Sequence, residues 1–96
     1  MRLLRGEMIY VESNVHVLEI HGSSLCWSVK MKLDDLMESL PVQFVRIHQS
    51  FVVNLDYVTA FTGHQMELAG GVKIPVSRAR YGQAKERFWE YLRDKV

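Results

Sequence analysis

The sequence has little of what several protein classes require. Its single cysteine, Cys26, cannot form an internal disulfide, which excludes a disulfide-stapled scaffold and fits a cytoplasmic protein. No apolar run approaches the roughly 18–20 residues of a membrane span, so we expect no membrane partner. Twelve basic and eleven acidic side chains give a net charge of +1. Bulk electrostatics alone would therefore not hold this chain on nucleic acid.

Signatures of metal, cofactor and catalytic sites are also scarce. The four histidines, at positions 16, 21, 48 and 64, have no metal-ligand spacing, and no glycine-rich loop opens a helix. His48 and Ser50 could pair as base and nucleophile, but the pattern offers no third group to orient them. We therefore expect no metal, no cofactor, no small-molecule substrate and no enzyme activity.

The length and composition are those of one folded domain. Ninety-six residues, with 48% hydrophobic side chains, suffice for a single core. No linker, repeat or low-complexity segment divides the chain. We therefore expect residues 1–96 to form one domain, with no receiver domain attached.

Short strands separated by turn residues fill most of the chain. Ser13–Asn14, Gly22–Ser24, Gly63–His64 and Gly70–Gly71 are typical turn sequences. Pro75 lacks a donor for a strand ladder and indicates an edge strand. Strands are predicted over residues 8–11, 15–21, 25–31, 44–47, 51–53, 57–61, 65–68 and 72–76.

Two segments have helical spacing instead. Apolar residues recur at intervals of three and four from Leu33 to Leu40, which predicts a short helix ended by Pro41. Ser77 is a candidate N-cap for a closing helix that runs to about residue 93. The fold class is thus mainly β, with one short internal helix and one C-terminal helix. The apolar stripe expected on the closing helix is Tyr81, Ala84, Phe88, Tyr91 and Leu92.

Polar residues gather where the predicted strands end: at His16, at His48–Ser50 and at Ser77–Arg80. Arginine matches guanine O6 and N7, glutamine matches adenine N6 and N7, and serine and arginine suit phosphates. From composition alone, solvated loop side chains are the default interpretation of these residues. A protein-interaction module could also use the same loops or an exposed strand edge.

Four motifs in order resemble the LytTR-type DNA-binding domains, the output domains of LytR/AgrA-like response regulators. Phe44–Asn54 resembles the family run F-x-R-x-H-x-S-[FY]-[IV]-V-N. Ile9–Ser13 resembles the opening strand, Leu33–Pro41 the helix that ends in Leu-Pro, and Ile74–Arg78 the closing I-P-V-S-R. The resemblance covers about residues 8 to 82, which is most of the chain.

The resemblance implies an elongated, antiparallel β domain, cytoplasmic and bacterial, that inserts loops into successive major grooves of double-stranded DNA. It implies binding to imperfect direct repeats in promoters, often as a homodimer, in transcription regulation within two-component systems. Carried over by position, the expected base contacts are His16, Gln49 and Arg78. The expected phosphate contacts are Arg46, Ser50, Ser77 and Arg80.

Three of these positions keep alternatives open. His16 could instead only cap its own loop. Gln49 stands where family members often have Arg, Asn or Lys, so the target sequence does not transfer. Arg46 could instead form an internal ion pair, for which Glu12 and Asp56 are the candidate partners.

Overall fold

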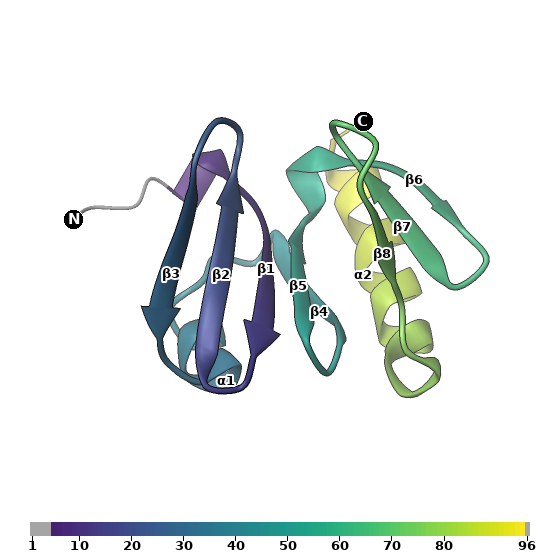
Figure 1. The fold of residues 1–96 in the computed structure, drawn as a ribbon. Helices are drawn as coiled ribbons and strands as arrows, with labels where there is room; N and C mark the ends of the chain where they lie inside the picture. The colour runs from purple at the N-terminus through teal and green to yellow at the C-terminus, as the bar shows by residue number, and fades with distance from the viewer. Residues whose placement is uncertain (1–4, 96) are drawn as a thin grey trace.

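The computed structural model describes residues 5–95 and arranges their strands in two antiparallel sheets (Figure 1). The larger sheet has five strands in the order β3-β2-β1-β5-β4, and the smaller has three in the order β6-β7-β8. The strands are β1 (Met8–Asn14), β2 (Val17–Gly22), β3 (Cys26–Lys30), β4 (Phe44–His48), β5 (Phe51–Asn54), β6 (Val58–Thr62), β7 (Gln65–Leu68) and β8 (Lys73–Pro75).

Helical segments join and cover these strands. The short helix α1 (Leu33–Met37) lies between β3 and β4, and the long helix α2 (Tyr81–Asp94) closes the chain. Single 3-10 turns are η1 (Arg5–Glu7), η2 (Leu55–Tyr57) and η3 (Arg78–Arg80). The expectation of a mainly β fold with one short internal and one C-terminal helix is therefore confirmed. Neither helix has the length and apolarity to cross a membrane, which is true of every helix within residues 5–95.

The five-stranded sheet is buried on both faces where β4 and β5 run. Side chains alternate between the two faces of a strand, so Val52 packs in one core and its neighbour Val53 in another. The first core lies on the α1 face, with Leu18, Ile20 and Leu33. The second lies between β4–β5, the small sheet and α2 (Figure 1). The domain measures 34 × 27 × 25 Å, so its elongation is modest.

The first hairpin turns one pair of residues later than predicted. Asn14 still belongs to β1 and pairs with Val17, and the turn consists of Val15 and His16. This register pairs Val11 with Ile20 on the buried face. A register slip would move these side chains to the other face. Burial therefore outweighed the turn preference of Ser13 and Asn14.

The internal helix is shorter than predicted, since α1 ends at Met37 and not beside Pro41. The amides of Ser39 and Leu40 bond carbonyls three residues back, at Leu36 and Met37, and the Ser39 hydroxyl also donates to the Leu36 carbonyl at 3.0 Å. Such local bonds compete with the helical pattern. The apolar spacing was still informative, because Leu36, Met37 and Leu40 pack against the core.

The start of the closing helix also differs from the prediction. Ser77 makes no side-chain capping bond and precedes η3, and α2 begins only at Tyr81. The apolar stripe is confirmed for Tyr81, Ala84, Phe88 and Tyr91, which pack in the core. It is wrong for Leu92, which is 37% exposed. Pro75 lies in the edge strand β8, as predicted.

Candidate nucleic-acid interface

Three loops lie together at one end of the molecule, which we call the loop end. They are the β1–β2 turn (Val15–His16), the β4–β5 turn (Gln49–Ser50) and the segment Ser77–Arg80 that leads into α2. Figure 1 shows all three at the bottom of the view, whereas the C-terminus of α2 lies at the top. These loops therefore hold every position that the motifs predicted to contact DNA except Arg46, which lies on β4.

Backbone hydrogen bonds hold these loops to one another. The Ser13 amide donates to the Ser50 carbonyl at 2.7 Å, which joins the first hairpin to the β4–β5 turn. The Ser77 amide donates to the Ile47 carbonyl at 2.8 Å. Strand β4 is the edge of its sheet and has a bulge between Arg46 and His48. Bulges often re-aim side chains next to functional sites. The bond from Ser77 thus covers a strand edge and fixes the third loop beside the second.

Two grooves flank the β4–β5 turn. The hairpin groove, of about 310 Å³, lies between that turn and the first hairpin and is lined in part by His16, Gln49 and Ser50. The helix groove, of about 570 Å³, lies on the η3 side and is lined in part by Gln49, Ser77 and Arg80. Residues common to both grooves are Asp34, Arg46 and Gln49. Of the predicted site residues only Arg78 lines neither groove, but it is exposed on η3 next to Ser77.

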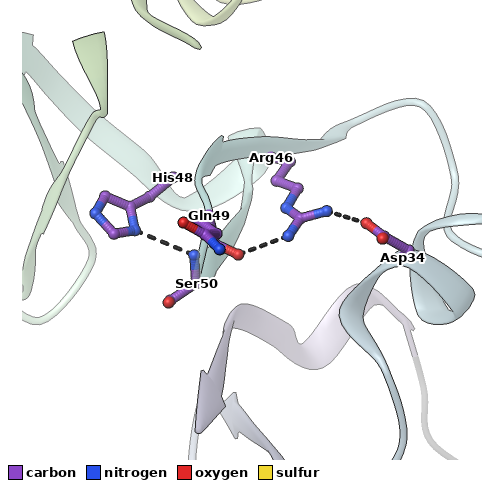
Figure 2. A network of polar contacts seen from close by, with 5 residues as sticks. All are labelled: Asp34, Arg46, His48, Gln49 and Ser50. Atoms are coloured by element: carbon purple, nitrogen blue, oxygen red, sulfur yellow. Dashed lines mark hydrogen bonds and ion pairs between the residues drawn. The ribbon is translucent and has the colours of Figure 1, made fainter. Parts of the chain in front are cut away.

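Arg46 lines both grooves, and its guanidinium has two partners, shown in Figure 2. Its Nη2 donates to the Gln49 carbonyl at 2.6 Å, and its Nη1 donates to the Asp34 carboxylate on α1. The Arg46 side chain is 19% exposed and that of Asp34 is 78% exposed. The alternative of an internal ion pair is therefore what the structure contains. Its partner is Asp34, and neither Glu12 nor Asp56.

The geometry explains why those two partners were wrong. Arg46 pairs across the ladder with Val52, which packs on the α1 face of the sheet. Glu12 follows Val11 of the same core and therefore points to the opposite face. Asp56 lies beyond Asn54, at the end of β5 away from the loop end.

His48 is hydrogen-bonded to the backbone of Ser50. The Ser50 hydroxyl does not take part in this bond. The Ser50 amide donates to His48 Nδ1 at 3.1 Å (Figure 2), and the imidazole lies edge-on to Phe51, with ring centroids 5.5 Å apart. An Nδ1 that accepts this bond leaves the proton of the neutral ring on Nε2. The pair thus shapes the β4–β5 turn, and it does not have the hydroxyl-to-imidazole bond of a nucleophile and its base.

One group of possible metal ligands lies away from the loops. Glu12, Glu19 and His21, on β1 and β2, each offer an atom within 4.8 Å of the others. Glu12 and Glu19 are directly paired across the strands. The sequence did not reveal this group because the three come together only through hairpin pairing. It is separate from the loop end.

The far end of the domain has the strongest perturbation of a titratable group. Burial, and then the hydrogen bond to the Asp56 carboxylate, raise the pKa of Tyr91 to about 12. The Tyr91 hydroxyl donates to Asp56 and so connects α2 with η2. This contact is structural and lies opposite the loop end.

Sequence reasoning missed two residues of the loop end. Asp34 was not among the predicted site residues, yet it lines both grooves and binds Arg46. Val15 was assigned to a strand, yet it forms the tip of the first hairpin. The only sequence signal for the Asp34 contact was that the acidic residues Asp34 and Asp35 precede the motif Phe44–Asn54, which contains a single arginine, Arg46.

An antiparallel β domain that presents polar, arginine-bearing loops at one end belongs to the class that positions binding residues on a rigid scaffold. Residues 2–89 match the model of the LytTr DNA-binding domain family. The chain belongs to this family.

The known proteins that are similar to this chain include a transcriptional regulator and a solved DNA-binding domain. The CO-responsive transcriptional regulator RcoM of Rhodospirillum rubrum is 30% identical over an alignment of 82 residues, which covers 76% of this chain and 34% of the regulator. The chain thus spans about a third of that relative's length. A solved LytTr DNA-binding domain from Bacillus cereus superposes with a TM-score of 0.82 at 22% identity, over 91% of this chain and 85% of the other. This second likeness shows that the two share a fold.

Proposed function

We propose that this chain binds double-stranded DNA in a sequence-specific manner, as the output domain of a transcription regulator, by inserting the loop end into the major groove. The observation that carries the proposal is the convergence of the three loops at one end of the domain. Hydrogen bonds between Ser13 and Ser50 and between Ser77 and Ile47 fix their spacing before any DNA is bound. Preorganisation of this kind reduces the entropy lost on binding.

The residues of the loop end divide by chemistry and exposure. His16, Gln49 and Arg78 are exposed, each on a different loop, and are the proposed base contacts. Arg78 would bind guanine O6 and N7 and Gln49 adenine N6 and N7. Ser50, Ser77 and Arg80 are half-buried along the grooves and suit the phosphates beside those bases.

Arg46 receives a different role from the one that the motif implied. Its guanidinium is already bound to Asp34 and to the Gln49 carbonyl. A phosphate would have to replace the carboxylate. We therefore assign Arg46 to positioning the β4–β5 turn that presents Gln49, and its test is described in the Discussion.

Selection from a random duplex pool tests the proposed function. Wild-type protein at physiological salt is expected to enrich a short repeated motif, which would fit binding to imperfect direct repeats as a homodimer. Arg78→Ala should relax the preference at one base pair and cost about 1–3 kcal/mol there. Arg93→Ala is the matched control, because Arg93 is exposed in the last turn of α2, away from the loop end.

Two results would contradict this assignment. Equal loss of affinity for every sequence with Arg78→Ala would remove Arg78 as a base contact. No enrichment by the wild-type protein, even at low salt, would favour a protein-interaction module that uses the same loops.

A further inference from the structure

The tip of the first hairpin contains a valine, Val15, in a backbone conformation that valine rarely adopts. Val15 and His16 are the two turn residues and have φ values of 44° and 65°. Two-residue hairpin turns favour positive φ at both positions, and Asn-Gly is the usual sequence. Valine is branched at Cβ, and a branched side chain at positive φ is a true outlier of backbone geometry. Val15 thus carries a conformational cost that asparagine or glycine would avoid.

Burial of the Val15 side chain does not offset this cost. The Val15 side chain is 83% exposed, the highest value among the large hydrophobic residues exposed in residues 5–95. It buries almost no apolar area, so it gains almost none of the stabilisation that burial provides. Strained residues of this kind are typical of functional sites, where the strain serves binding.

The position of Val15 indicates what it meets. Val15 lines the hairpin groove together with His16, Gln49 and Ser50. If His16 and Gln49 contact base edges, the isopropyl group of Val15, which lines the same groove of the protein, is brought to the same groove of the DNA. The 5-methyl group of thymine is the one alkyl group that the four bases present in the major groove. An exposed branched alkyl group beside two hydrogen-bonding side chains therefore complements a thymine next to the bases that they contact.

We infer that Val15 contacts the 5-methyl group of a thymine and thereby sets specificity at one further base pair. This inference rests on the proposed function and adds an apolar contact to its polar ones. It predicts that the selected motif contains a thymine whose methyl group, and not only its hydrogen-bonding edge, contributes to affinity.

Replacing thymine by deoxyuridine removes only the methyl group and leaves the base pair intact. After the selected motif is known, each thymine is replaced singly and binding is measured by fluorescence anisotropy. At one position the wild-type protein should bind the deoxyuridine duplex about fourfold more weakly, the effect of one buried methyl-sized group. Val15→Ala should bind the two duplexes equally.

Val42→Ala is the matched control. Val42 is 79% exposed and loses the same atoms on substitution, but it lines a pocket with Tyr91 at the opposite end of the domain. This variant should keep the fourfold ratio. Thermal unfolding of Val15→Ala should show a midpoint no lower than wild type, since the side chain is exposed and strained.

The outcomes distinguish a failure of the role of Val15 from a failure of the proposed DNA binding. A selected motif without thymine, a ratio of one at every thymine, or a fourfold ratio that persists in Val15→Ala would each overturn the role of Val15 while DNA binding stands. No selected motif would overturn both.

Discussion

Replacement of Arg46 by methionine tests how the β4–β5 turn is held. Methionine keeps an apolar stem against the sheet and removes the guanidinium. The hydrogen bond to the Gln49 carbonyl is lost, and a bond from a charged donor contributes roughly 1.5–3 kcal/mol. The ion pair adds less than about 1 kcal/mol, because the Asp34 carboxylate is 78% exposed.

The Nε atom of Arg46 offsets part of this loss of stability. Arg46 Nε is buried and has no hydrogen-bond partner among the described residues. Such a group costs roughly 1–3 kcal/mol, which methionine relieves. We therefore expect Arg46→Met to lower the free energy of unfolding by about 1 kcal/mol, or the midpoint of thermal unfolding by about 4–8 °C in a domain of this size. Urea and thermal unfolding followed by circular dichroism measure both.

The same variant distinguishes a positioning residue from a phosphate contact. If Arg46 positions Gln49, Arg46→Met should relax selection at the base pair that Gln49 contacts and leave the salt dependence of affinity unchanged. Arg80→Met should instead reduce the slope of log affinity against log salt by about 0.9. A reduced slope with unchanged base preference in Arg46→Met would refute the positioning role and restore the phosphate contact.

Two further predictions concern the scaffold. Asn54 is fully buried, and its side chain donates to the Met8 carbonyl at 2.9 Å and accepts from the Asp56 amide at 2.9 Å. Asn54→Ala should therefore lower the free energy of unfolding in urea by about 2–4 kcal/mol. A loss below about 1 kcal/mol would show that water replaces both bonds. The pKa of Tyr91 is raised to about 12 from its ordinary 10.0, so the unfolded chain loses this proton first. Stability from this group should be complete below pH 10 and fall as the pH rises toward about 12, and Tyr91→Phe should flatten that part of the pH–stability curve.

The parts of the fold that follow from local patterning could be predicted from the sequence. Apolar runs, alternating apolar residues and turn sequences located every strand. The apolar run Phe51–Val53 indicated a buried strand, and the structure covers this strand on both faces. The length of α1 could not be predicted, because its last turn depends on the Ser39 hydroxyl bonding the Leu36 carbonyl. The turn at Val15 violates local preference and is set by the register of Val11 with Ile20.

The candidate site, too, could be predicted from the sequence only in part. Motif order predicted which loops matter, and the structure brings those loops together. The motifs could not predict which face of the sheet Arg46 would occupy relative to Glu12, because that requires knowledge of the strand pairing. Nor could spacing reveal that α1 delivers Asp34 to the β4–β5 turn, since this contact depends on how the helix packs on the sheet.

The charge at the loop end limits how the proposed DNA binding can work. The ion pair of Arg46 with Asp34, which is the one formed within residues 5–95, removes a cation from the surface that would face phosphates. Lys32, Arg78 and Arg80 remain there. If Lys32 and Arg80 each neutralise one phosphate while Arg78 contacts a base, the slope of log affinity against log salt is about −1.8 for one copy. Electrostatic attraction of that size gives weak non-specific binding, so base contacts must supply most of the discrimination. Two copies on a direct repeat would double these contacts and raise affinity through effective concentration, which is the physical reason to expect repeated sites for a domain with so little excess charge.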